Sequence, residues 1–178
     1  MPQNIGLTLT TIIPLAEIDP QLVEGLLDAA FGDNRKSRTA YKVREGMDML
    51  EGLSIAAVDD EKNELIGTIQ CWPVALTDSD EKMHPVIMVG PVAVHPECQR
   101  EGVGRAMMAA LLKEVQPDES LPLVMIGDPE YYERFFDFSA ERTGGWSLPG
   151  PWEPERLLAR ISNNVATPES GMLGPWKR

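Results

Sequence analysis

Residues 86–115 constrain the fold of this chain more than any other segment. They read VIMVGPVAV, then HPECQRE, then GVGRAMMAALLKEV. The apolar run predicts a buried strand, and the helical spacing of the last part predicts a helix that ends before Pro117. Gly102 and Gly104 stand where that helix begins. Because the first turn of a helix carries unpaired N–H groups and the positive end of its dipole, the segment predicts an anion site.

The glycines follow Gln99 in the pattern Q-x-x-G-x-G. A Walker A loop needs Gly-Lys-Ser/Thr, and a dinucleotide fingerprint needs a third glycine where Met107 stands, so neither matches. Q-x-x-G-x-G resembles the acyl-CoA pyrophosphate loop of the GCN5-related N-acetyltransferase (GNAT) superfamily, and GPVAVHPE resembles its central strand. The alternative is a strand–turn–helix unit whose glycines serve packing alone. The resemblance implies that the coenzyme is bound by Gln99, Arg100, Glu101, Gly102, Val103, Gly104 and Arg105.

Gly90-Pro91 interrupts the apolar run. Proline has no N–H for a strand ladder, so the pair predicts a bulge or a point where neighbouring strands separate. The alternative is the end of an edge strand. Separation would leave backbone groups without partners at Val92, Ala93 and Val94. In the superfamily that the chain resembles, the pantetheine arm of the coenzyme pairs with that part of the strand.

The composition limits the partners of this chain. Its 178 residues carry a net charge of −12, which argues against nucleic acid and anionic membranes and favours a cationic acceptor. No apolar run approaches the ~20 residues of a membrane span, and no signal peptide is recognisable, so we expect a cytoplasmic protein. Cys71 and Cys98 have no zinc spacing and are expected to be free thiols, with Cys98 more readily a bystander than a reactive group.

The remaining elements follow from caps, breakers and periodicity. Asp19-Pro20 predicts the start of a helix that ends at Gly32, and Asp128-Pro129 predicts the start of a short helix over 130–136. A further helix is expected at 39–49, and strands are expected at 7–13, 53–58, 65–74 and 121–126. Residues 77–83 are expected to form a loop, residues 153–161 a brief helix or strand, and the tail from about residue 163 is compatible with disorder.

The short helix 130–136 carries the sequence EYYERFFDF at positions 130–138. It resembles the FYxxxGF element that closes the GNAT site, which implies that Tyr132 is the acid that protonates the departing thiolate. Tyr131 is the alternative acid, and an aromatic that only packs beneath the coenzyme is the alternative role for Tyr132. Asp137 replaces the usual glycine, and aspartate can take the left-handed conformation that glycine would adopt. The SLPGP stretch at 147–151 resembles the YhbS-like subgroup of the superfamily.

The general base stays open at this stage. Both histidines have the appropriate pKa range, but His95 is expected near the pyrophosphate and His84 before the central strand. Glu64 and Glu97 are the other candidates, and a water relay is the alternative. The basic loop at 34–38 either faces the acceptor through Arg35, Lys36 and Arg38 or is simply solvated. No metal site is expected.

The sequence thus predicts a single α/β (α+β) domain over residues 1–178, with a core of about 7–138 and a Gly/Pro/Trp-rich segment at 139–178. The resemblance implies a mixed, mostly antiparallel sheet, splayed at the central strand, with helices on both faces. It also implies an N-acetyltransferase that uses acetyl-CoA as cosubstrate and acts on a small amine or a peptide. The alternative function is a catalytically silent acyl-CoA-binding regulatory module. We expect the C-terminal segment either to wall the acceptor pocket or to contact a second copy in a homodimer.

Overall fold

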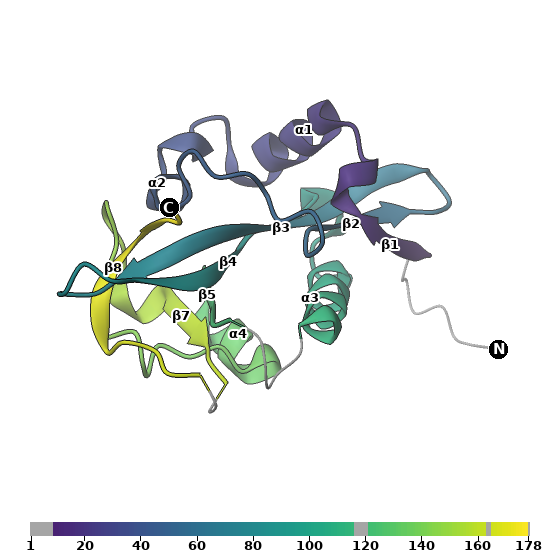
Figure 1. Ribbon diagram of the computed structural model, residues 1–178. Coiled ribbons are helices and arrows are strands. Elements are labelled where there is room, and N and C mark those ends of the chain that lie inside the picture. Colours follow the sequence, from purple (N-terminus) through teal and green to yellow (C-terminus); the bar gives the residue numbers. More distant parts are fainter. Residues whose placement is uncertain (1–8, 116–120, 163–164, 178) are drawn as a thin grey trace. The chain divides into compact units, whose positions relative to one another are not determined.

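The computed structural model describes residues 9–115, 121–162 and 165–177. Its strands pair in the order β1-β2-β3-β4-β5-β7, and β8 pairs with both β3 and β6 (Figure 1). The pairs β4–β5 and β6–β8 are parallel, whereas β1–β2, β2–β3, β3–β8 and β5–β7 are antiparallel. The prediction of a mixed, mostly antiparallel sheet with helices is therefore confirmed.

The strands are β1 (Thr10–Pro14), β2 (Ile55–Asp59), β3 (Glu64–Thr77), β4 (Met83–Val94), β5 (Leu123–Ile126), β6 (Gly145–Ser147), β7 (Leu157–Arg160) and β8 (Ser170–Pro175). The helices are α1 (Pro20–Phe31), α2 (Thr39–Val43), α3 (Val103–Glu114) and α4 (Pro129–Phe136). Short 3-10 turns occur at Leu15–Glu17, Arg35–Ser37, Pro96–Cys98 and Pro154–Arg156.

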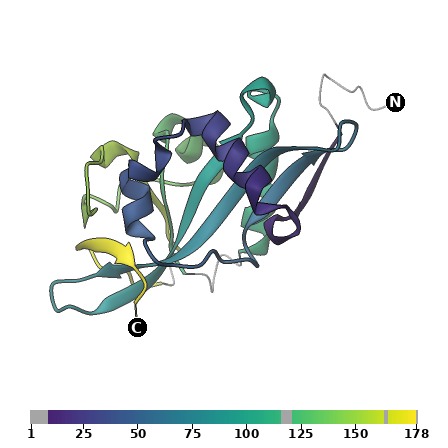
Figure 2. The same cartoon turned by 90° about the horizontal axis from the view of Figure 1, so that it is seen from above.

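The chain divides into two compact units, each built from three segments. Among the described residues, the first unit takes residues 9–35, 50–70 and 91–114. The second unit takes residues 36–49 and 71–90 and the described residues from 115 onward. Both β3 and β4 pass from one unit to the other, and they lie side by side, joined by the turn at 78–82 (Figure 2). The single domain expected from the sequence stays a prediction.

In the first unit, α1 and α3 cover opposite faces of the β1–β2 part of the sheet (Figure 1). The Asp19 side chain accepts a hydrogen bond from the Gln21 N–H at 2.9 Å, and Pro20 opens α1. Gly32 follows the helix with φ 90°. The predicted start and end of α1 are thus confirmed, because they depend on a cap, a proline and a glycine that act locally.

The second unit has its own apolar core. Eleven buried residues form it, and Trp72, Trp152 and Ile161 are among the partly buried side chains that pack against it. Its members come from α2, from the described strands β3, β4, β5, β6, β7 and β8, and from the loop after β6. The helix α2 packs against β8 in this unit. Trp146 lies within the core and donates its indole N–H to the Pro168 carbonyl at 3.0 Å.

Several predicted boundaries need correction. The helix expected at 39–49 ends at Val43, because the backbone turns at Arg44 and Gly46 takes φ 76°. The tail interpreted as compatible with disorder contains β8, which pairs with β3 and β6. β3 extends to Thr77, three residues beyond the predicted strand, since β8 pairs with it from Val74 onward. Residues 7 and 117, used in two of the sequence arguments, lie outside the described residues.

The parallel pairing of β4 with β5 is short. It joins Ile87 to Leu123 and Met88 to Val124, while Met125 and Ile126 pair with β7. Pairing therefore stops two residues before Gly90-Pro91, which is where the sequence predicts that strands part. Gly90 itself has φ 134°, a backbone conformation that side-chain-bearing residues rarely adopt.

Candidate functional site

The loop between β4 and α3 is the centre of the predicted coenzyme site. It begins with a 3-10 turn, Pro96–Cys98, and ends where α3 starts at Val103. Arg100 and Gly102 both have left-handed backbone conformations, with φ 73° and 86°. The Gln99 side-chain amide donates to the Val94 carbonyl at 3.4 Å, which folds the loop back on the end of β4. Successive changes of backbone handedness of this kind turn N–H groups toward one point and favour anions.

A close contact between β3 and α3 holds the start of that helix. A Cβ on Gly67 of β3 would lie 2.8 Å from Met107 Cε and 3.0 Å from Val103 Cγ1. Glycine at this position therefore leaves room for the Val103 and Met107 side chains against the strand, and a larger residue would have to displace them. Val103, Met107, Met108 and Leu111 are buried in consequence. The helix entrance is thus held by packing, while its first-turn amides remain directed away from the helix body.

The predicted pyrophosphate residues come together in this loop and first turn. Ala106 N–H bonds to the Gly102 carbonyl at 3.0 Å, so Gly102 serves as the N-cap residue. Arg100 and Arg105 are exposed, and Val103 is buried. These positions supply backbone donors and positive charge in one place, which suits a diphosphate. The binding roles of Gln99, Glu101 and Gly104 stay predictions along with those of their neighbours.

Neither histidine is placed as a free base. His95 donates its backbone N–H to the Ile66 carbonyl at 2.8 Å, and its Nδ1 accepts from the Glu97 N–H at 3.2 Å. It therefore caps the 3-10 turn Pro96–Cys98, and its nearness to the pyrophosphate stays a prediction. Glu64 and Glu97 are exposed surface carboxylates.

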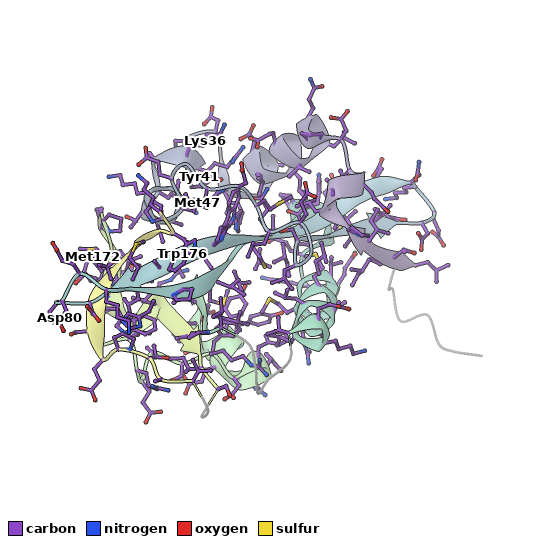
Figure 3. All side chains as sticks on the ribbon, in the orientation of Figure 1. Lys36, Tyr41, Met47, Asp80, Met172 and Trp176 are labelled. Carbon is purple, nitrogen blue, oxygen red and sulfur yellow. The ribbon has the colours of Figure 1, made fainter. Side chains whose placement is uncertain are left out.

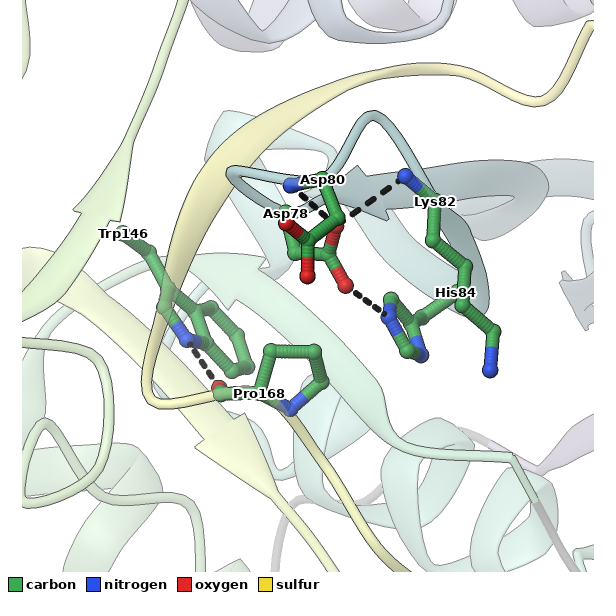
Figure 4. A network of polar contacts seen from close by, with 6 residues as sticks. All are labelled: Asp78, Asp80, Lys82, His84, Trp146 and Pro168. Carbon is green, nitrogen blue, oxygen red and sulfur yellow. Dashed lines mark hydrogen bonds and ion pairs between the residues drawn. The ribbon is translucent and has the colours of Figure 1, made fainter.

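His84 belongs to a polar cluster at the turn that joins β3 and β4 (Figure 4). Its Nε2 lies 2.8 Å from Asp78 Oδ2, and Asp78 Oδ1 accepts from the N–H groups of Asp80 and Lys82. The hydrogen bond from His84 and those backbone donors hold the pKa of Asp78 below its usual value. The His84 side chain thus stabilises the turn between β3 and β4.

Tyr132, the predicted acid, lies on α4 in the second unit. Asp128 caps this helix by accepting from the Glu130 N–H at 3.0 Å. A Cβ on Gly127 would lie 2.7 Å from the Tyr132 ring, so Gly127 makes room for the phenol. Burial, followed by electrostatic interaction with Tyr131 and Asp128, raises the pKa of Tyr132 to about 12. The hydroxyl therefore stays protonated at neutral pH and is available as a donor.

The end of α4 confirms that Asp137 adopts the left-handed conformation expected from the sequence. Asp137 stands where the resembled motif has glycine, and it adopts the left-handed conformation with φ 61° and ψ 33°. Its N–H bonds to the Tyr132 carbonyl, and so does the Phe138 N–H at 3.3 Å. The aspartate thus closes the helix as glycine would.

Two charged or reactive groups considered at the sequence level have structural roles. Arg35 is 2% exposed and pairs with Glu24 and Asp28 of α1, so its interpretation as an acceptor-facing residue is wrong. Lys36 and Arg38 are exposed. Burial, followed by the charge of Glu101, raises the pKa of the Cys98 thiol, which disfavours a reactive thiolate.

The structure also reveals a group that the sequence analysis missed. The Trp72 indole N–H donates to the Gly90 carbonyl at 3.0 Å, and the Arg44 guanidinium lies over the Trp72 ring. Gly90 lies 18 residues after Trp72 in the sequence. Arg44 precedes Trp72 and stands directly after α2. No motif or periodicity joins them; only the unexplained Trp within an apolar strand was a signal.

Two searches of the described ranges complete the site. Residues 9–115, 121–162 and 165–177 contain no group of three His, Cys, Asp or Glu side chains suited to hold a metal ion. Among the helices within those same ranges, none has the length and apolar character that crossing a membrane requires.

Comparison with known proteins places the chain beside acetyltransferases. A family model described as an acetyltransferase (GNAT) domain matches residues 11–136. The "Uncharacterized N-acetyltransferase YhbS" of Escherichia coli K12 is 26% identical over 157 residues, which are 88% of this chain and 90% of that protein.

Two solved structures share the fold. The crystal structure of Escherichia coli YhbS in complex with CoA has a TM-score of 0.66 and 20% identity, covering 93% of this chain and 89% of that one. A GNAT family acetyltransferase from Brucella melitensis, crystallised with acetyl-CoA, has a TM-score of 0.58 and 22% identity, with coverages of 92% and 94%. At these identities, the structures show a common fold.

Proposed function

This chain belongs to the GNAT acetyltransferase family, and on that premise we propose that it is an acetyl-CoA-dependent N-acetyltransferase. It transfers an acetyl group to a primary amine of a small molecule or peptide, by direct attack while both substrates are bound. The two related structures described above hold CoA and acetyl-CoA, which supports this choice of cosubstrate.

The loop before α3 is the observation that carries the proposal. It combines first-turn amides, a left-handed pair at Arg100 and Gly102, and two exposed arginines within one short segment. First-turn amides and two exposed arginines at one helix entrance, in a chain of net charge −12, support an anionic ligand at this loop. A diphosphate fits these donors, whereas the Gly-Lys-Ser/Thr that cradles nucleotide triphosphates is missing from the sequence.

Bound acetyl-CoA supplies the activated acyl group, and the residues of this chain assist its transfer. Backbone N–H from the Val92–Val94 segment of β4 polarises the thioester carbonyl. The Tyr132 hydroxyl, which is protonated at neutral pH, donates a hydrogen bond to the departing sulfur, and the thiolate then takes up a proton from solvent water. A lysine-like amine with a pKa of ~10.4 must first lose a proton, which costs roughly 4–5 kcal/mol at pH 7. Since both histidines have structural contacts, we assign that proton to a water relay.

The acidity of the chain suggests the nature of the acceptor. A net charge of −12 attracts cationic amines and repels nucleic acid and anionic membranes. We therefore propose a cationic small molecule or a basic peptide end as the acceptor.

Ligand-dependent stabilisation tests the coenzyme part of the proposal. A ligand present at 100 times its Kd stabilises a protein by about 2.7 kcal/mol, which raises the Tm of a domain of this size by about 5–10 °C. We expect that rise with acetyl-CoA and CoA and no rise with ATP or NAD. Equal stabilisation by ATP would point to a general nucleotide-phosphate site.

A matched pair of glycine substitutions locates the site. Gly102 and Gly46 have similar left-handed conformations, with φ 86° and 76°, and Gly46 lies far along the chain in the second unit. Gly102→Ala and Gly46→Ala each impose a backbone cost of roughly 1–2 kcal/mol. Only Gly102→Ala should abolish stabilisation by acetyl-CoA. Equal loss of binding in both variants would refute the assignment of this loop.

Turnover distinguishes the enzyme from its alternative. Amines, polyamines, aminoglycosides and peptide N-termini are screened for release of free thiol from acetyl-CoA. Thiol release with at least one acceptor supports the transferase. Tight binding of acetyl-CoA without turnover of any acceptor would favour the catalytically silent acyl-CoA-binding regulatory module.

A further inference from the structure

The backbone of β4 is held by a side chain at its bend. Gly90 has φ 134°, and its carbonyl group belongs to the peptide bond with Pro91, which has no N–H. The Trp72 indole N–H of the neighbouring strand β3 donates to that carbonyl at 3.0 Å. The Gly90–Pro91 peptide has no N–H to offer a strand ladder, and its carbonyl accepts a hydrogen bond from the Trp72 side chain, which helps to orient the plane of this peptide.

The tryptophan ring is itself held in place. Arg44, the residue that follows α2, lies with Cζ 3.8 Å from the centre of the Trp72 ring and 4.1 Å from the centre of the Tyr41 ring. A planar guanidinium between two aromatic faces restricts the rotation of both rings. Tyr41 lies on α2 (Figure 3), and Trp72 packs against the core of the second unit. The α2 segment, β3 and the bend of β4 are thus linked in a single chain of contacts.

We propose that Trp72 is a positioning residue for acyl transfer, with Arg44 holding its ring. The inference rests on the proposed function, in which the backbone of Val92–Val94 polarises the thioester. Those residues follow directly after Gly90-Pro91. The orientation of that peptide therefore influences the direction in which their backbone N–H groups point. Donors of this kind act only when they are aimed before the reaction, and small misplacements cost rate rather than binding.

Trp72→Phe tests the inference, because phenylalanine keeps a ring beside Arg44 and loses only the indole donor. We expect kcat to fall about tenfold, the order of one hydrogen bond to a well-aimed group, while the KM for acetyl-CoA changes by less than about twofold. The carbonyl stretch of bound, isotope-labelled acetyl-CoA should move toward its frequency in solution. Trp72→His, which keeps a ring N–H, should recover part of both effects.

Trp152→Phe is the matched control. Trp152 also packs, partly buried, against the core of the second unit, and it lies far from Gly90 in the sequence. The Trp152→Phe variant should change the Tm as much as Trp72→Phe does. Its kcat and its carbonyl frequency should equal those of the wild type. A similar fall in kcat in both variants would overturn the inference, since loss of packing would explain it.

The remaining outcomes are also decisive. If Trp72→Phe lowers Tm but keeps kcat and the carbonyl frequency, Trp72 only packs and the inference is wrong while the proposed function stands. If the wild-type protein fails to bind acetyl-CoA, the proposed function is refuted and the inference is refuted with it. If acetyl-CoA binds but no acceptor turns over, the carbonyl frequency of the binary complex alone decides.

Discussion

Replacing Tyr132 by phenylalanine tests the chemistry most directly. The substitution removes one hydroxyl from a half-buried ring that lies beside Gly127. The fold should tolerate this change, because the ring contacts with Tyr131 and Phe138 do not involve the hydroxyl. An effect on turnover can then be assigned to the lost proton donor.

The raised pKa decides how large that effect should be. With the Tyr132 pKa at about 12 and a thiol near ~8.5, complete proton transfer to the thiolate is unfavourable by about 5 kcal/mol. We therefore expect Tyr132 to act as a hydrogen-bond donor to the developing negative charge. Such bonds to charged partners contribute about 1.5–3 kcal/mol, so Tyr132→Phe should lower kcat by roughly 10- to 150-fold.

The dependence on pH provides a second, independent measurement. A phenol whose pKa is raised keeps its proton until the pH approaches that raised value, so the ratio of wild-type to variant kcat should stay constant from pH 7 to pH 10. A tyrosine with the ordinary pKa of ~10 would lose half of its contribution at about pH 10. A ratio that declines in this way would contradict the effect of burial described here.

The assay follows free thiol released from acetyl-CoA with a saturating acceptor, and the Tm with and without CoA reports binding. Tyr131→Phe is the matched control, because its ring meets that of Tyr132 edge to face, with centroids 4.9 Å apart. We expect it to keep kcat within about threefold. Unchanged kcat in Tyr132→Phe, or an equal loss in Tyr131→Phe, would refute the assignment of Tyr132 as the donor.

Two further predictions concern stability. Arg35→Met removes the partner of two half-exposed α1 carboxylates, and we expect a loss of about 1–3 kcal/mol in urea unfolding, against less than about 0.5 kcal/mol for the exposed control Lys36→Met; equal losses would contradict the buried pairing. Burial raises the Cys71 pKa to about 12, so its contribution to stability is complete below pH 9 and declines as the pH rises toward 12. Wild-type stability should accordingly decrease more steeply than that of Cys71→Ala above pH 9, and parallel pH dependences would contradict this.

The elements that the sequence predicted well are those with local signals. Both Asp-Pro pairs cap helices in the structure, through Asp19 on α1 and Asp128 on α4. The start of α3 at Val103 also agrees, since glycine in a left-handed conformation marks it. A cap needs only the next few residues to act, so a short window of sequence contains all the information that determines it.

The elements that were missed depend on distant partners. The strand β8 has glycines and a proline and little periodicity, yet it pairs with β3 almost a hundred residues earlier in the chain. Similarly, the burial of Arg35 depends on Glu24 and Asp28, whose four-residue spacing on α1 turns both carboxylates toward one face. The spacing of the two carboxylates is visible in the sequence. It did not predict the burial of Arg35, because arginines in basic loops are usually solvated.

The same distinction separates the binding of the coenzyme from the reaction. An anion site made of backbone amides needs glycines at fixed positions, and Gly102 therefore predicts such a site from the sequence. In the proposed reaction, the direction of the amides that polarise the thioester depends on Gly90, whose carbonyl accepts a hydrogen bond from Trp72, and Arg44 lies over the Trp72 ring. These three residues are far apart in the sequence, so no short sequence motif contains all of them. Substitutions at Trp72 and Arg44 are accordingly expected to alter kcat while leaving the recognised loop, and the affinity for CoA, unchanged.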